Sequence, residues 1–152
     1  ILDLPITALI PQDYIQDTEL RLATYRRISA ITSLGALDDI RDELEDRFGE
    51  IPDEVEHLLA LIALRIRVEA LGIESIIERE REIVIRPVNT DGMERALTSQ
   101  LGLAVKLTRH SIRIRLLDLA MPWREALEIV LQAIEKSTVA LPRHPELAAS
   151  LR

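Results

Sequence analysis

The stretch that decides the fold is PDEVEHLLALIALRIRVEALG, residues 52–72. Its apolar residues recur at intervals of three and four, which places them on one side of an α-helix. Pro52 suits the first turn of that helix, where its missing N–H costs nothing, and Gly72 suits the end. We therefore predict that this helix is the central packing element of the fold. Its inward residues are Val55, Leu58, Leu59, Ile62, Ile66 and Ala70.

Two more helices are predicted upstream of this one. The first spans about 18–32 and can be capped by Asp17 or Thr18. Ser33 and Gly35 separate it from a second helix at about 36–48, which Gly49 ends as a left-handed cap. The inward residues expected of the first helix are Leu20, Ala23, Ile28 and Ile31.

The second half of the chain has a different periodicity. Short isoleucine-rich runs predict strands at 73–79 and 82–86, and alternating residues predict strands at 103–107 and 112–116. Helices are predicted at 91–101, ended by Gly102, and at 122–137, opened by Pro122. The predicted fold class is therefore α+β, a helical N-terminal half packed on a small mixed β-sheet with two further helices. Residues 1–140 are expected to form a single domain, with 1–13 as a connecting arm or edge strand and 141–152 as a loosely ordered tail.

Charge is unevenly distributed along the chain, whose net charge is −7. Residues 1–57 hold 14 acidic and five basic side chains, whereas residues 58–152 hold 12 acidic and 14 basic ones. Much of the excess lies in one stretch, DDIRDELED at 38–46. This stretch is either a solvated helix face or a docking surface for a basic partner.

Several classes of function are disfavoured by what the sequence lacks. There is no cysteine, which excludes a thiol nucleophile and a disulfide framework. No glycine-rich phosphate loop is present, and no histidine has a second ligand at metal-binding spacing. No apolar run is long enough to span a bilayer. We expect a non-catalytic, cytoplasmic module with no cofactor of its own, no membrane contact and no direct DNA binding.

Two alternatives remain open from the residues alone. A basic strand face formed by Lys106, Arg109, Arg113 and Arg115 would suit a nucleic-acid contact, although no aromatic side chain accompanies it. His110 beside Ser111 would suit a hydrolase, although no glycine-flanked nucleophile turn supports it.

The N-terminal half resembles the C-terminal domain of the bacterial transcription-repair coupling factors (Mfd). The resemblance rests on LRLATYRRI at 20–28, on DRFGEIP at 46–52 and on LLALIALR at 58–65. Leu71-Gly72-Ile73 matches the exit from the third helix. The likeness is strong over about 1–75, looser over the sheet and last helix, and absent after about 140. The chain does not begin with Met, which suggests a segment of a longer protein or a processed chain.

The resemblance implies a regulatory role. The whole protein would be an ATP-driven DNA translocase that acts on stalled RNA polymerase and recruits UvrA, with ATP and Mg bound in its motor and not in this domain. This domain would hold the N-terminal UvrB-like module of the same chain and mask the surface that UvrA binds. The alternative is an accessory module that contacts nucleic acid or RNA polymerase.

The residues expected at that intramolecular interface are four acids of the 38–46 stretch. The resemblance implies that Glu43 and Asp46 face arginines of the N-terminal module. Helical spacing adds Asp42 and Asp39, one turn earlier on the same side. Glu45 stands where other members often carry an apolar residue, so the acidic face is expected to be shifted or wider here.

Overall fold

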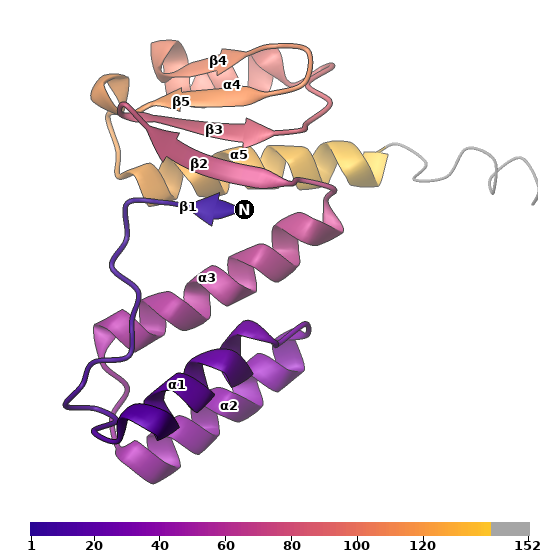
Figure 1. The fold of residues 1–152 in the computed structure, drawn as a ribbon. Coiled ribbons are helices and arrows are strands. Elements are labelled where there is room, and N and C mark those ends of the chain that lie inside the picture. The colour runs from indigo at the N-terminus through magenta and orange to yellow at the C-terminus, as the bar shows by residue number, and fades with distance from the viewer. Residues whose placement is uncertain (141–152) are drawn as a thin grey trace, which may run out of the picture. The chain divides into compact units, whose positions relative to one another are not determined.

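The computed structural model describes residues 1–140 and confirms the α+β class. Within this range the chain forms two compact units (Figure 1). The helical unit contains residues 4–70 together with Leu2, and the sheet unit contains residues 71–140 together with Ile1 and Asp3. The predicted tail at 141–152 lies outside the described residues.

The helical unit contains α1 (Thr18–Ser29), α2 (Leu34–Phe48) and α3 (Asp53–Ala70). Each of the first two helices begins where a side chain accepts a hydrogen bond from a backbone N–H of the first turn. The Asp17 carboxylate accepts from the N–H of Leu20 at 2.9 Å, and the Ser33 hydroxyl accepts from the N–H of Ala36 at 3.2 Å. Helix α3 starts directly after Pro52, as predicted.

Several sequence predictions in this unit are wrong. The first helix ends at Ser29 and not at 32, and Ala70, predicted to face inward, is exposed. Helix α2 begins at Leu34 and not at 36, because Ser33 caps the helix and Gly35 is accommodated in its first turn. Ala23 is exposed, and the next residue, Thr24, is buried instead. Burial of Thr24 is tolerated because its hydroxyl donates to the carbonyl of Leu20 at 2.7 Å.

One core joins the three helices to the segment that precedes them. The side chains of α1, α2 and α3 pack around Ile10 and Ile15 of that segment, which are 4% and 1% exposed. The partly buried rings of Tyr14, Tyr25 and Phe48 pack against this core. The buried members from the helices and the α1–α2 connection are Ile28, Ile31, Leu37, Ile40, Leu44, Val55, Leu59 and Ile62.

The sheet unit is built on a five-stranded mixed sheet of order β1-β2-β3-β5-β4. Its strands are β1 (Leu2–Asp3), β2 (Ser75–Arg79), β3 (Glu82–Arg86), β4 (Val105–Leu107) and β5 (Ile112–Arg115). Neighbours from β2 to β4 are antiparallel, with Ile76 opposite Ile85 and Ile83 opposite Ile114. Strand β1 runs in the same direction as β2 (Figure 1).

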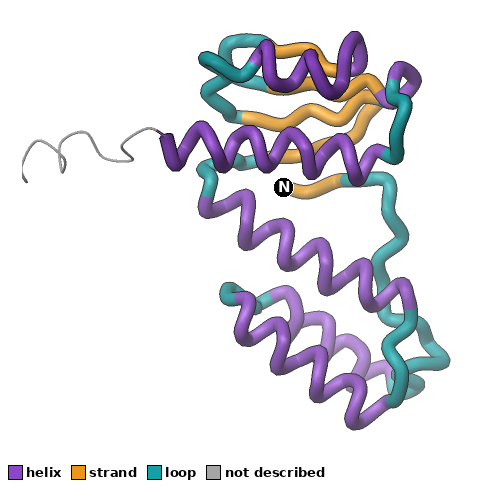
Figure 2. The backbone as a smooth tube through the Cα atoms, turned by 180° about the vertical axis from the view of Figure 1, so that it is seen from behind, coloured by secondary structure: helices purple, strands orange, loops and turns teal. Residues whose placement is uncertain are grey.

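Helices α4 (Glu94–Leu101) and α5 (Trp123–Ala140) cover one face of this sheet, behind the strands in Figure 1 and in front of them in Figure 2. Isoleucines of the strands, such as Ile76 and Ile112, are buried with Leu97 of α4 and Val130 of α5. Short 3-10 turns, η1 (Gly102–Ala104) and η2 (Leu116–Asp118), flank the last two strands. The strand predicted from 103 therefore starts at Val105.

Candidate interaction surface on helix α2

Helix α2 carries the acidic stretch, and its inward side is packed into the core of the helical unit. Its inward side is formed by Leu37, Ile40 and Leu44, which are 5%, 4% and 2% exposed. The remaining faces are polar because the intervening positions are occupied mostly by acids. The exposed acids are Asp38, Asp39, Asp42, Glu45 and Asp46.

The structure places the four predicted interface acids on one helix. Asp39, Asp42 and Asp46 are separated by three and four residues, which lines them up along one side of α2. Glu43 is three residues before Asp46 and borders the same side. We call these four residues, Asp39, Asp42, Glu43 and Asp46, the acidic stripe.

Glu43 differs from the other three because it is ion-paired within the unit. The guanidinium of Arg27 in α1 donates from Nη1 to Oε2 at 2.6 Å and from Nη2 to Oε1 at 2.9 Å. Nη1 of Arg47 lies 3.3 Å from the same Oε2. The hydrogen bonds from Arg27 are the main reason that the pKa of Glu43 is lowered to about 2. Glu43 is therefore an anion that already has cationic partners.

The three aspartates of the stripe have no such partner. Among residues 1–140, no Lys, Arg or His nitrogen lies within 4.0 Å of the carboxylates of Asp39, Asp42 or Asp46. All three side chains are exposed. Their charges are thus available to a basic partner.

Side-chain contacts with neighbouring elements hold α2 in position. The hydroxyl of Tyr14 lies 3.1 Å from the carbonyl oxygen of Leu44 and 3.0 Å from that of Gly49. Burial, and then the nearby charges of Glu45 and Glu56, raise the pKa of Tyr14 above its usual value, so the hydroxyl remains protonated. On the other side, Arg41 forms an ion pair with Glu56 of α3.

Sequence reasoning missed this supporting set, namely Tyr14, Arg27 and Arg41. The helical pattern shows that Arg27 and Glu43 are exposed polar residues of their own helices. It does not show which faces meet after the chain reverses between α1 and α2. The only signal in the sequence was compositional: residues 1–57 hold 14 acidic side chains and only five basic ones, so the basic ones have many possible partners. In the structure three of the five, Arg27, Arg41 and Arg47, pair with acids.

A metal site and a catalytic site at His110 and Ser111 have less support from the structure. No group of three or more His, Asp or Glu side chains within residues 1–140 could hold a metal ion. At the β4–β5 turn, His110 is exposed and the hydroxyl of Ser111 lies 2.6 Å from that of Thr108. This turn therefore does not hold an imidazole and a hydroxyl as a base and nucleophile. His144 lies outside the described residues.

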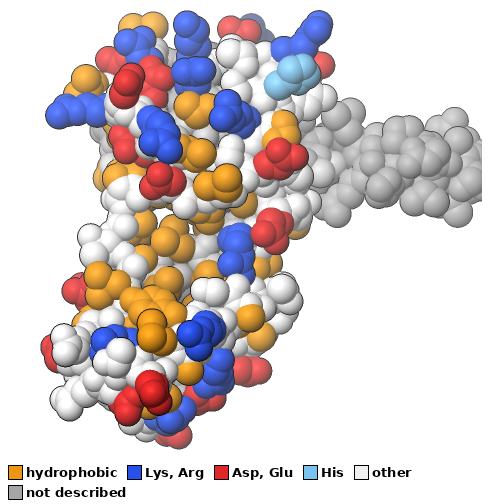
Figure 3. Space-filling model, viewed as in Figure 1, with side chains coloured by type: hydrophobic (Ala, Val, Ile, Leu, Met, Phe, Trp, Pro, Cys, Tyr) orange, Lys and Arg blue, Asp and Glu red, His pale blue; other side chains and the backbone are white. Residues whose placement is uncertain are grey.

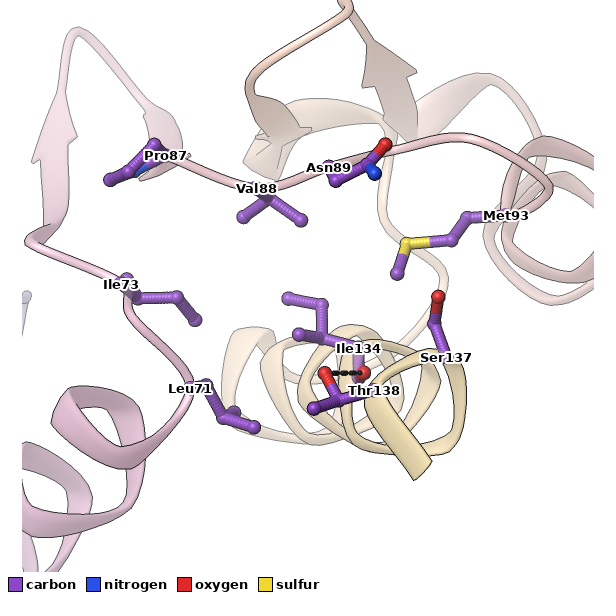
Figure 4. Close-up of a pocket in the computed structure, with 9 residues that line it drawn as sticks. All are labelled: Leu71, Ile73, Pro87, Val88, Asn89, Met93, Ile134, Ser137 and Thr138. Carbon is purple, nitrogen blue, oxygen red and sulfur yellow. Dashed lines mark hydrogen bonds between the residues drawn. The ribbon is translucent and has the colours of Figure 1, made fainter. Parts of the chain in front are cut away.

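A small hollow in the sheet unit is lined mostly by apolar residues. It has a volume of about 150 Å³ between α5 and the loop after β3. Ile73, Val88 and Ile134 point into it (Figure 4). The hydroxyl of Thr138 is already engaged, since it donates to the carbonyl of Ile134 at 2.9 Å. Its polar lining residues are Asn89, Ser137 and Thr138, and none of them carries a charge.

None of the helices described in residues 1–140 is long and apolar enough to cross a membrane.

Comparison with known proteins identifies relatives of one kind. The family model described as "TRCF domain" matches residues 4–96. The transcription-repair-coupling factor of Haemophilus influenzae is 43% identical over 75 residues, which are 49% of this chain and 6% of that protein. That of Staphylococcus epidermidis is 27% identical over 142 residues, 89% of this chain and 12% of that protein. The chain therefore spans only a small part of the length of these relatives.

A solved structure shares the fold. The crystal structure of a C-terminal domain of transcription-repair coupling factor aligns with a TM-score of 0.69 at 18% sequence identity. The alignment covers 93% of this chain and 95% of that one.

Proposed function

Because this chain belongs to the TRCF domain family, as a domain of a transcription-repair coupling factor, we propose that it is a non-catalytic regulatory domain that binds another module of the same protein. Its partner is the N-terminal UvrB-like module. By holding that module it masks the surface that UvrA binds, and its release exposes this surface. RNA polymerase acts on the domain only indirectly, through the rearrangement that releases it. ATP-driven movement on DNA belongs to other parts of the coupling factor.

The observation that carries this proposal is the acidic stripe on α2. Asp39, Asp42 and Asp46 are exposed, lack a cation among the described residues and share one side of an anchored helix. Such an arrangement presents several negative charges at fixed spacing, which suits arginines on a folded partner better than a flexible tail would.

The strength of the contact suits a reversible clamp. Ion pairs between exposed side chains contribute only about 0.2–1 kcal/mol each. A few of them can therefore keep the two modules together and still allow them to separate. Within one polypeptide the effective concentration of the two modules is high, so weak contacts are sufficient.

Glu43 has a different part in the proposed interface from that of the aspartates. Arg27 and Arg47 occupy both of its carboxylate oxygens. A partner arginine must share these oxygens or displace Arg27, and displacement breaks a two-point ion pair. We therefore propose that Asp46 and Asp42 make most of the contacts with the partner. Glu43, held by Arg27, helps to orient the partner's arginines.

The test is binding of UvrA to the full-length coupling factor that contains this chain. The triple variant Asp39→Asn, Asp42→Asn, Asp46→Asn removes the unpaired charges of the stripe. We expect UvrA affinity to rise by between a few-fold and about a hundredfold, because three weak ion pairs are lost from the closed state.

A matched control removes three exposed acids elsewhere in the helical unit. Asp13→Asn, Glu19→Gln and Glu50→Gln change the net charge by the same amount. This control is expected to leave UvrA affinity at its original value. Equal affinity in the stripe variant and the unmodified protein contradicts the proposed interface. Equal gains in the stripe and control variants would show a general charge effect instead.

A further inference from the structure

Within the described part of the sheet unit, residues 71–140, one face of the sheet has no helix packed on it. Helices α4 and α5 lie on the same side of the sheet (Figures 1 and 2), where the isoleucines of the strands are buried. The opposite side chains of the same strands point away from the helices, because successive residues of a strand alternate between faces. We call this the open face.

Basic side chains dominate the open face. The strand register brings Arg113 of β5 between Lys106 of β4 and Val84 of β3. Figure 3 views this side, with Lys and Arg side chains gathered over the strands and a few acidic and apolar ones among them. Its charged members in the strands are Arg79, Glu82, Arg86, Lys106, Arg113 and Arg115.

Part of this charge is satisfied internally and part is not. Glu82 lies 3.3 Å from Arg113 and 4.0 Å from Arg115. No carboxylate of residues 1–140 lies within 4.0 Å of Arg86 or Lys106. The face is also hollowed at this point: Lys106, Arg113 and Arg115 line a depression of about 470 Å³ together with Glu82 and Thr108.

Apolar groups accompany the cations. Ile77 and Val84 sit opposite each other on the open face, both only half-buried. At the end of β5, the turns η1 and η2 lie side by side, and each exposes a leucine. Leu103 is 88% exposed and Leu117 is 74% exposed, the two largest values for a leucine among the described residues. These two neighbouring leucines can therefore contribute apolar area to a contact with a partner.

We propose that the open face, with Leu103 and Leu117 at its end, binds an acidic polypeptide segment that carries apolar side chains. Carboxylates of the segment pair with Arg86 and Lys106 and enter the depression, and its apolar residues cover the two leucines. This surface is distinct from the acidic stripe, both in its residues and in the sign of its charge.

The same cations would also attract nucleic acid, but two observations favour a polypeptide. The strands of the open face contain no aromatic side chain on which bases could stack. The exposed leucines contribute nothing to contacts with phosphates, whereas they suit a peptide that alternates acidic and apolar residues.

The test measures binding of synthetic peptides to the 152-residue chain by titration calorimetry. The probes are a peptide of glutamate and leucine pairs and, for comparison, an all-glutamate peptide of equal length. Arg86→Glu with Lys106→Glu reverses two unpaired cations and leaves the Glu82 ion pairs in place. We expect this variant to bind both peptides more weakly by on the order of tenfold.

The control variant is Arg95→Glu with Lys136→Glu. These residues are exposed cations of α4 and α5, on the covered side of the sheet. We expect this control to bind the peptides as the unmodified chain does. Equal losses in the two variants would contradict the proposed site, because they would show a response to net charge alone.

A second pair of changes tests the apolar part. Leu103→Ser with Leu117→Ser is expected to weaken binding of the glutamate–leucine peptide several-fold and to leave the all-glutamate peptide unaffected. The proposal is overturned if a short DNA duplex binds the open face more tightly than either peptide. It is also overturned if the chain self-associates through this face. In that case the measured mass of the unmodified chain would rise with concentration, and Arg86→Glu with Lys106→Glu would abolish this rise.

Discussion

The guanidinium of Arg27 and the carboxylate of Glu43 form a two-point ion pair between α1 and α2, with nitrogen–oxygen distances of 2.6 and 2.9 Å. This bidentate geometry is the most specific way in which an arginine binds a carboxylate. The pair holds Glu43 in one orientation beside the three unpaired aspartates. Arg27, a residue of this domain, therefore fixes the position and the charge of one member of the acidic stripe.

Replacing Arg27 tests the energetic value of this pair. Arg27→Gln is expected to lower the free energy of unfolding by about 0.2–1 kcal/mol, because both side chains are substantially exposed to water, 51% for Arg27 and 35% for Glu43. The pKa of Glu43 should rise towards its usual value. Urea unfolding and an NMR titration of the Glu43 carboxyl measure the two effects. Arg26→Gln, an exposed arginine of the same helix, is the control, and an unchanged Glu43 pKa in Arg27→Gln would contradict the assignment.

The same pair predicts a pH dependence of stability. The pKa of Glu43 is about 2 in the folded chain against a usual value of 4.5. Because the folded value is the lower one, the stabilisation is present above about pH 4.5 and is lost as the pH falls towards 2. The difference in unfolding free energy between the unmodified chain and Arg27→Gln should thus be constant near neutral pH and shrink in acid. Urea titrations at a series of pH values measure it, and a difference that persists undiminished near pH 2 would rule out this origin.

Tyr14 is expected to hold the last turn of α2. Tyr14→Phe removes the hydroxyl that bonds to the carbonyls of Leu44 and Gly49, at a cost of about 0.5–1.5 kcal/mol. Amide hydrogen exchange at Arg47 and Phe48 should become faster. Tyr25→Phe serves as the comparison, because the Tyr25 hydroxyl accepts from the N–H of Ile10, which lies outside α2. Equal acceleration in both variants would mean that α2 responds to overall stability only.

The turn between β2 and β3 is a site for stabilisation. Glu80 and Arg81 adopt positive φ angles of 53° and 64°, which non-glycine residues rarely do. Glu80→Asn with Arg81→Gly should raise the free energy of unfolding by roughly 1 kcal/mol, because Asn-Gly favours this two-residue hairpin turn. Thermal and urea unfolding provide the measurement. Glu80→Ala with Arg81→Ala removes the same side chains without relieving the backbone, so an equal gain there would point to charge and not to strain.

Much of the fold could be predicted from the sequence where local signals are strong. The apolar stripe from Val55 to Ile66, bounded by Pro52 and Gly72, correctly placed α3. The predictions failed where a single side chain decides a boundary. Ser33 is predicted to separate two helices, whereas its hydroxyl caps α2 and the helix begins at the next residue.

The candidate site was accessible to the sequence only in part. The positions of Asp39, Asp42 and Asp46 on one side of a helix follow from periodicity alone. The pairing of Glu43 with Arg27 does not, because it joins residues 16 apart through the packing of two helices. The burial of Thr24 in place of Ala23 could not be predicted for a similar reason: the helical rotation is set by tertiary contacts, and a local hydrogen bond makes the polar residue acceptable.

The spacing of the acidic stripe has a geometric consequence. From Asp39 to Asp46 the helix advances seven residues at 1.5 Å each, so the carboxylates span about 10 Å along a straight axis. A partner whose cations are closer together or farther apart can pair with only some of them. The stripe therefore selects its partner by the distance between positive charges as well as by their number, and a partner surface that deforms by a few ångströms would lose contacts one at a time.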